Sequence, residues 1–172
     1  QRDSIHWRAQ KEWDHTYADY YIHTGDFEQA IPYLRKVIKH EMRRKQKARE
    51  WFLLGQLLAA TGKKQEAYKA FKHVTRLNPP YELEFNARIS MTEVMARGNA
   101  KQMISRLKRM AASDNNKEYL DQIYYAIGNI YLNEKDTVQA ISAYEKGNAK
   151  ATRSGIETVS YTHLTLPTNR EV

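Results

Sequence analysis

The sequence predicts an all-α fold, a superhelical solenoid of about four helix-turn-helix hairpins. Small residues recur in similar helical stretches at Ala30, Ala67 and Ala140; the first interval is 37 residues and the second is 73, nearly twice as long. Glycine (7) and proline (4) are scarce and alternating apolar runs are absent, so we expect no sheet. Polar turns recur in step with the small residues, at Gly25, Gly62, Gly98 and Lys135.

The first hairpin is expected over residues 11–43. Gly25 should end its first helix, because glycine readily adopts the left-handed conformation of a helix C-cap. Asp14 stands where the pattern calls for a large apolar residue. The other positions, counted from Lys11, carry small or large apolar residues at helical spacing: Tyr17, Ala18, Tyr21, Ala30 and Leu34.

The second hairpin, expected over residues 48–77, shows the pattern most clearly. Counted from Ala48, its key residues are Trp51, Leu54, Gly55, Leu58, Gly62, Ala67, Phe71, Val74 and Pro79. This order resembles the tetratricopeptide repeat, whose pattern is W-x2-L-G-x2-Y…A-x3-F…P. The small residue at position 8 of the first helix should face the small residue at position 20 of the second, so that the two helices pack closely.

The third and fourth hairpins are expected over residues 84–112 and 121–150. The fourth follows the pattern well, with Gly128 and Ala140 at the two small positions and Tyr144 at the aromatic one. The third matches worst, because Met91 and Met103 occupy its small positions. Two facing methionines hold helices apart, so this hairpin should be the widest of the four.

The two ends do not follow the repeat. Residues 1–10 are expected to be the end of a preceding helix or an artefact, and the array should run over residues 11–155. The Thr-rich segment 156–172 lacks an apolar period, so we expect it to be unstructured. Its last part, SYTHLTLPTNREV, resembles translated sequencing adaptor, which implies a non-native tail on an internal fragment of a longer protein.

The resemblance to tetratricopeptide repeats implies a binding module rather than an enzyme. Arrays of this family present a concave face, lined by positions 2, 5, 9, 12 and 13 of each first helix, to an extended or helical peptide. The protein is therefore expected to bind a partner protein and no small-molecule substrate. From those positions we select as the partner-binding groove Arg49, Phe52, Gln56, Phe85, Arg88, Thr92, Tyr125 and Asn129.

The net charge of +8 is concentrated in one stretch. Residues 35–49 contain eight basic residues and one acid, whereas nucleic-acid-binding proteins usually spread basic charge along a face and add stacking aromatics. A solvated segment between hairpins is the expected structure, and nucleic acid is disfavoured as a partner. Contact with phosphate, acidic lipid headgroups or an acidic partner stays open. The basic patch comprises Arg35, Lys36, Lys39, Arg43, Arg44, Lys45 and Lys47.

No residues for catalysis, cofactors or metals can be assembled from the sequence. The chain has no cysteine, no glycine-rich phosphate loop and no Ser/His/Asp set, so we expect neither an enzyme nor a cofactor. His15, Asp19 and His23 share one helix face at a spacing of four residues. The two histidines would lie about 12 Å apart along the axis, too far to share one metal ion.

Three stretches resemble a particular kind of tetratricopeptide-repeat protein: AIPYLRKVIKHEMRRKQKAR, NPPYELEFNARI and NKEYLDQIYYAIGNIYL. Together they resemble the repeat region of the PorW/SprE type of Bacteroidota lipoproteins. That resemblance implies a scaffold at the periplasmic face of the outer membrane, in type IX secretion and gliding motility. The alternative is a cytoplasmic adaptor or regulator that contacts an acidic or nucleic-acid partner through residues 35–49. No apolar run in the sequence is long enough to span a membrane.

Overall fold

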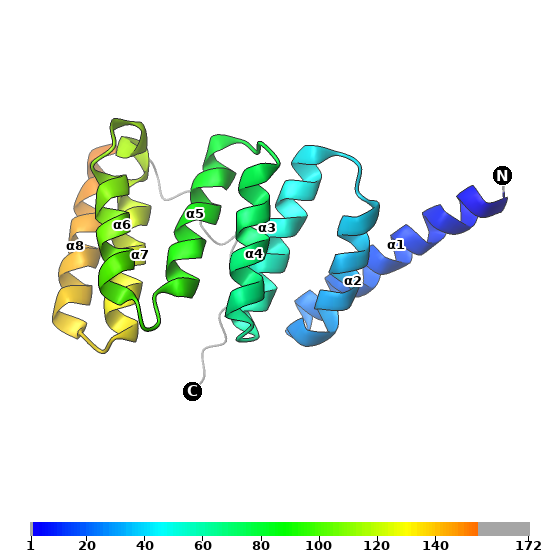
Figure 1. Cartoon of the computed structure of the whole chain (residues 1–172), viewed down its shortest axis with the longest axis horizontal. Helices are drawn as coiled ribbons and strands as arrows, with labels where there is room; N and C mark the ends of the chain where they lie inside the picture. Colours follow the sequence, from blue (N-terminus) through cyan, green and yellow to red (C-terminus); the bar gives the residue numbers. More distant parts are fainter. Residues whose placement is uncertain (1, 155–172) are drawn as a thin grey trace. The chain divides into compact units, whose positions relative to one another are not determined.

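The computed structural model describes residues 2–154, with the side chains of residues 9–151, as a succession of helices (Figure 1). Within that range every element is helical, which confirms the all-α prediction. In chain order the elements are α1 (Arg2–His23), α2 (Phe27–His40), α3 (Arg44–Ala60), α4 (Lys64–Arg76), α5 (Tyr81–Met95), α6 (Ala100–Ala111), the 3-10 helix η1 (Asp114–Tyr119), α7 (Leu120–Asn133) and α8 (Thr137–Ser154).

The predicted turn residues lie between the two helices of each hairpin. Gly25, Gly62 and Gly98 have φ values of 78°, 79° and 84°, the left-handed conformation that a side chain disfavours by roughly 1–2 kcal/mol. In the last turn Lys135 takes that conformation instead, with a φ of 63°. The backbone N–H of Asp136 then donates to the carbonyl of Tyr131 at 2.9 Å, which closes the end of α7.

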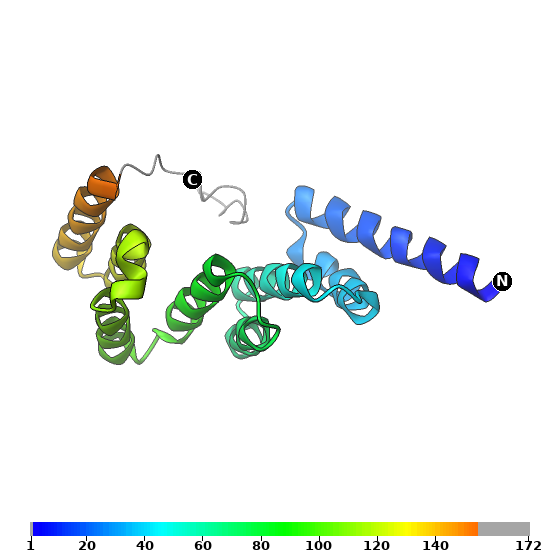
Figure 2. The ribbon, with the colours of Figure 1, turned by 90° about the horizontal axis from the view of Figure 1, so that it is seen from above.

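A glycine allows close helix packing in the hairpins α3–α4 and α7–α8. A Cβ atom built on Gly55 would lie 2.5 Å from Cε1 of Phe71, and one built on Gly128 would lie 2.6 Å from Cδ1 of Tyr144. Real Cβ atoms do not approach neighbours so closely, so an aromatic ring occupies the space that a side chain would need. Figure 2 shows α3 beside α4 and α7 beside α8.

The first hairpin, α1–α2, uses alanine for the same purpose. Ala18 and Ala30, at the two small positions, are both buried. Helix α1 has 22 residues and α2 has 14, so α1 continues beyond its partner toward the N-terminus (Figure 1). Residues 2–10, expected as the end of a preceding helix, run without a break into this first helix.

The described chain divides into two compact units within α5, between Arg88 and Ile89. The core of the first unit is centred on Leu54, Leu57 and Phe71, which are fully buried. The core of the second is centred on side chains from α6 and α7, of which Leu107 and Ile127 are among the most deeply buried. Each core is built from the apolar faces of helices that are polar elsewhere.

The third predicted hairpin, α5–α6, differs from the others. Met91 and Met103 are half-buried, whereas the alanines and glycines at these positions elsewhere are buried. The wider helix spacing expected here stays a prediction. The sequence analysis did not predict the short helix η1. There Asn116 is buried, and its side-chain amide donates to the carbonyl of Met110 at 2.8 Å.

The structure changes one predicted boundary that concerns function. Helix α3 begins at Arg44 rather than near residue 48, so only residues 41–43 separate it from α2. The basic stretch 35–49 is therefore mostly helical, not a solvated loop. Residues 156–172, expected to be unstructured, lie outside the described residues. Among the described helices, none combines the length and apolar character that crossing a membrane requires.

Candidate functional site

Three of the eight predicted groove residues lie at the surface. Arg49, Arg88 and Tyr125 come from α3, α5 and α7, the first helices of their hairpins, and all three are exposed. The Arg88 guanidinium donates to Oε1 of Glu84 at 2.6 and 3.1 Å, which holds it along α5. Tyr125 is 62% exposed, and its ring lies 5.4 Å from that of Tyr144. These side chains are available to a partner.

Three other predicted groove residues are buried and must be reassigned to the core. The ring of Phe52 packs 5.4 Å from that of Phe71, inside the hairpin α3–α4. The side chain of Phe85 is buried to a similar extent. The Thr92 hydroxyl donates to the carbonyl of Ile89 at 2.6 Å, within its own helix. Repeat position alone could not separate these residues from exposed ones, because burial depends on how far neighbouring helices cover each position.

The two remaining groove residues, Gln56 and Asn129, are half-buried. Asn129 lies in a short polar chain that links three helices. The Tyr144 hydroxyl donates to Oδ1 of Asn129 at 2.8 Å, and Nδ2 of Asn129 donates to Oε1 of Glu93 at 3.3 Å. Burial raises the pKa of Glu93, while the Asn129 hydrogen bond lowers it by less. Sequence reasoning missed Glu93, which no repeat pattern marks.

The eight residues divide between the two units. Arg49, Phe52, Gln56, Phe85 and Arg88 belong to the first unit, and the rest belong to the second. The predicted groove residues therefore form two sets, one in each unit. In the first unit, Arg49 and Arg88 contribute positive charge. In the second, the exposed groove residue is aromatic.

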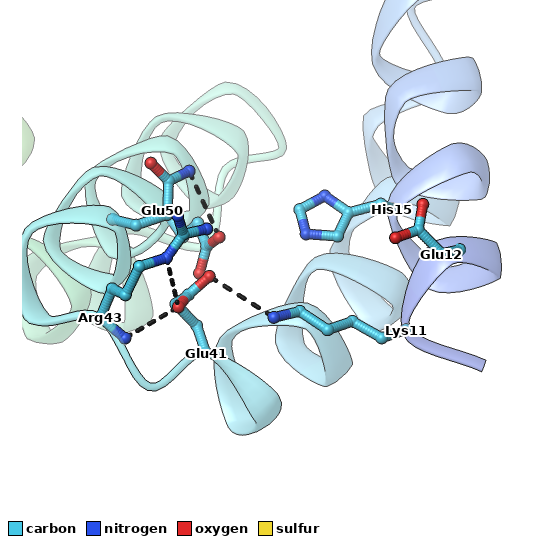
Figure 3. Close-up of a pocket in the computed structure, with 7 residues that line it drawn as sticks. Lys11, Glu12, His15, Glu41, Arg43 and Glu50 are labelled. Carbon is cyan, nitrogen blue, oxygen red and sulfur yellow. Dashed lines mark hydrogen bonds and ion pairs between the residues drawn. The ribbon is translucent and has the colours of Figure 1, made fainter. Parts of the chain in front are cut away.

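A polar pocket in the first unit was not predicted as a whole. It has a volume of about 410 Å³ and lies between α1 and the start of α3. Figure 3 shows Glu41 flanked by Arg43 and Lys11, with His15 and Glu12 projecting from α1. The lining residues are Lys11, Glu12, His15, Glu41, Arg43, Gln46 and Glu50.

Glu41 lies in the short connection between α2 and α3 and is 2% exposed. Its Oε1 accepts from the backbone N–H of Arg43 at 2.8 Å and lies 3.5 Å from Arg43 Nε. Its Oε2 lies 3.7 Å from Nζ of Lys11. Burial by itself raises the pKa of Glu41, but these partners together outweigh burial and hold the pKa below its ordinary value. Glu41 therefore carries a well-compensated negative charge.

Glu50, on α3, is the contrasting carboxyl of the pocket. It is 4% exposed, and within the described part of the chain its side chain accepts one long hydrogen bond, of 3.4 Å, from the side-chain amide of Gln46 to Oε1. Its Oε2 is buried and has no hydrogen-bond partner among the described residues. Burial, and next the negative charge of Glu41, raise the pKa of Glu50 above its ordinary value. A buried oxygen without a donor is costly, since water no longer solvates it.

The basic patch lies on the end of α2 and the start of α3. Arg35 donates to Glu66 on α4 at 2.6 Å, and Lys36 lies over the ring of Tyr33 at 5.3 Å. Lys39, Arg44 and Lys45 are exposed and Lys47 is half-buried, while Arg43 faces Glu41. Six of the seven predicted patch residues are thus exposed, and two of these six, Arg35 and Arg43, also pair with an acidic side chain of the first unit.

Aromatic side chains form a ladder on the hairpin α1–α2. The ring of Tyr17 stacks on Trp13 at 5.7 Å and on Tyr33 at 5.1 Å, and Tyr21 also stacks on Tyr33, at 5.8 Å. Trp13 and Tyr20 are largely exposed. The sequence analysis did not predict this ladder, because helical spacing alone does not reveal that rings from two helices meet.

His15, Asp19 and His23 do not converge. His15 lines the pocket, whereas Nδ1 of His23 lies 2.7 Å from the backbone carbonyl oxygen of Asp19. Across the described residues, no three histidine or acidic side chains are arranged to hold a metal ion.

Comparisons with known proteins agree with this architecture. The tetratricopeptide repeat family matches residues 48–81, and again residues 15–39 and 121–148, which together cover half of the chain. Among solved structures, the crystal structure of MamA is similar, with a TM-score of 0.56 and 18% sequence identity. The match covers 84% of this chain and 80% of that one, and at this identity it concerns the fold alone. No curated protein matches the chain significantly.

Proposed function

The chain belongs to the tetratricopeptide repeat family, and from that premise we propose that it is a non-catalytic scaffold that binds a partner protein. The observation that carries the proposal is the exposure of Arg49, Arg88 and Tyr125 on the first helices of their hairpins. Arginine and tyrosine are enriched among the residues that dominate protein–protein binding energy. Arg88 is also pre-oriented by Glu84, which reduces the entropy it would lose on binding.

The experiment is capture of partners by the protein in its full-length form. We expect Arg49→Glu, Arg88→Glu and Tyr125→Ala, combined, to reduce the captured partner at least about tenfold, because each removes an exposed contact of a hot-spot type. Lys72→Glu is the matched control, since it reverses an exposed charge on α4, a second helix. Circular dichroism verifies that every variant stays folded. Normal capture by the triple variant would rule out this surface.

A second candidate is contact with an acidic partner through the exposed part of the basic patch. One observation favours it: the first turns of α3 carry Arg44, Lys45 and Lys47 and no acid. The positive end of the helix dipole disfavours cations there, so their presence is not explained by stability. If Arg43→Glu with Arg44→Glu abolishes capture while the triple variant binds normally, the basic patch is the binding surface.

We further propose that the scaffold serves an envelope-associated assembly for type IX secretion and gliding motility. The support is the resemblance of three stretches to the repeat region of the PorW/SprE type of lipoproteins. This proposal places the protein at the periplasmic face of the outer membrane. The test is the coding sequence upstream of Gln1, where a signal peptide ending in a lipid-modified cysteine is expected. A cytoplasmic fraction that contains all of the full-length protein would overturn it.

A further inference from the structure

The polar pocket between α1 and α3 contains one buried carboxylate oxygen that nothing satisfies. Oε2 of Glu50 has no hydrogen-bond partner in residues 9–151, although Glu50 is almost fully buried and lines the pocket. Nearly all buried polar groups in folded proteins have a partner. In its ionised form this carboxyl only accepts hydrogen bonds, so a partner that stabilises the charge must be a donor.

The cations that already line the pocket are directed to the other carboxyl. Both Lys11 and Arg43 pair with Glu41, at 3.7 and 3.5 Å. Figure 3 shows these two interactions converging on Glu41, while Glu50 receives a single dashed line from Gln46. Among the described residues Glu50 forms no direct ion pair, although the charges of His15 and Lys11 act on it more weakly than burial does. The adjacent Glu41 adds a second negative charge that would attract a cation.

The volume of the pocket and the charges that line it restrict which ligands can bind there. Its volume of about 410 Å³ has room for a side chain and far exceeds that of a bare ion, and no metal-holding arrangement exists among the described residues. Lys11 and Arg43 are paired with Glu41, so Glu12 and Glu50 remain to disfavour an anion. What remains is a positively charged organic group that donates hydrogen bonds.

We propose that this pocket receives an arginine side chain of the bound partner, whose guanidinium donates to Oε2 of Glu50. Arginine is favoured over lysine because a guanidinium is more weakly hydrated and presents several donors in a planar fork. The inference rests on the proposed scaffold function and adds to it a specific recognition element. It also gives a role to Glu50, which is otherwise a buried, poorly satisfied carboxyl in the middle of a repeat.

The test uses the whole chain and needs no knowledge of the partner. N-acetyl-arginine methylamide is titrated into isotope-labelled protein while the backbone amide signals of Gln46, Glu50 and Arg43 are followed by NMR. We expect saturable shifts of these signals, weaker shifts with the lysine analogue, and none with the citrulline analogue, which is neutral and nearly the same shape. Equal shifts with citrulline would overturn the proposal, because charge would then play no part.

Variants of Glu50 decide whether this residue is the recognition element. Glu50→Gln keeps the size of the side chain and should weaken arginine binding at least about tenfold, as expected for losing a charge-assisted hydrogen bond. Glu50→Asp keeps the charge and should retain part of the affinity. Glu82→Gln, which changes an exposed carboxyl on α5 outside the pocket, should bind normally. Unchanged binding by Glu50→Gln would overturn the proposal.

Failure of the pocket and failure of the scaffold function give different results. If arginine does not bind but the full-length protein captures a partner through Arg49, Arg88 and Tyr125, only the pocket inference falls. If arginine binds through Glu50 but no partner protein is captured, the proposed scaffold function is rejected, while the pocket is still an arginine-binding site.

Discussion

In both α3–α4 and α7–α8 the two helices pack closely through a glycine and an aromatic ring, but only the ring of α7–α8 carries a hydroxyl group. In each, an aromatic ring of the second helix covers a glycine of the first. In α3–α4 the ring is Phe71, 2% exposed and surrounded by apolar side chains such as Phe52. In α7–α8 the ring is Tyr144, which is half-buried and donates its hydroxyl to Asn129.

That hydroxyl adds a hydrogen bond at a position where Phe71 makes apolar contacts. Through Asn129, Tyr144 is linked to Glu93 on α5, which belongs to the same unit. The apolar hairpin gains stability from area removed from water. The polar one gains less from burial, but its hydrogen bonds fix the orientation of three helices. The comparison teaches that one repeat pattern permits both solutions, and that the residue at the aromatic position decides between them.

The largest expected difference between the two hairpins concerns loss of the ring. Phe71→Ala should lower the free energy of unfolding by about 3–5 kcal/mol, because it leaves a cavity beside Gly55. Tyr144→Ala should cost less, since its ring is half-buried and water can fill the space. Urea unfolding followed by circular dichroism measures both, and hydrogen exchange assigns each loss to its hairpin. Equal losses would show that the two rings bury equivalent surface.

The glycines offer the next test. Gly55→Ala and Gly128→Ala should each destabilise by about 1–3 kcal/mol from overpacking, offset by roughly 1 kcal/mol of gained helix propensity. Gly147→Ala is an intermediate case, because its Cβ would meet the backbone carbonyl oxygen of Asp121 at 3.2 Å, which is tight but wider than the contacts at Gly55 and Gly128. In a Phe71→Leu background the cost of Gly55→Ala should shrink. If it does not, contact with the ring is not its cause.

A smaller effect is expected for the hydroxyl alone. Tyr144→Phe should lower the free energy of unfolding by about 0.5–1.5 kcal/mol, because Oδ1 of Asn129 loses its donor. Tyr124→Phe is a matched control on α7, as no hydrogen bond from its hydroxyl to a described residue is seen. Thermal denaturation resolves the difference. A loss no greater than that of the control would mean that the polar connection adds no stability.

The smallest effect concerns pH. Because the pKa of Glu93 is raised in the folded protein, the folded state holds this proton more tightly than the unfolded state does. Stability from this group is therefore full below the ordinary glutamate pKa of 4.5 and declines as pH rises through the folded value. Glu93→Gln should remove that decline in the exchange protection of α7. The matched change Glu50→Gln should leave the pH dependence of α7 intact, because Glu50 lies in the other unit.

The sequence predicted the hairpins well, because their signals are local. A period near 37 residues, turn residues and paired small residues each restrict a short stretch of chain, and they correspond to the paired helices α1–α2, α3–α4 and α7–α8. The site was predicted less well. Phe52, Phe85 and Thr92 share repeat positions with exposed residues, yet neighbouring helices bury them. The contrast between Glu41 and Glu50 depends on partners such as Lys11, which lies far away in the sequence.

One turn bears on the order of folding. The hairpins α1–α2 and α3–α4 close through a glycine, but α7–α8 closes through Lys135, which must adopt a left-handed conformation. A handicap of about 1 kcal/mol means that the unfolded chain samples this turn roughly five times less often than a glycine turn. Structures rich in local contacts fold quickly. Between two similar hairpins, we expect the one whose turn forms more often to fold first. Helices α3 and α4 are therefore expected to pair before α7 and α8, so that the array grows outward from its N-terminal half.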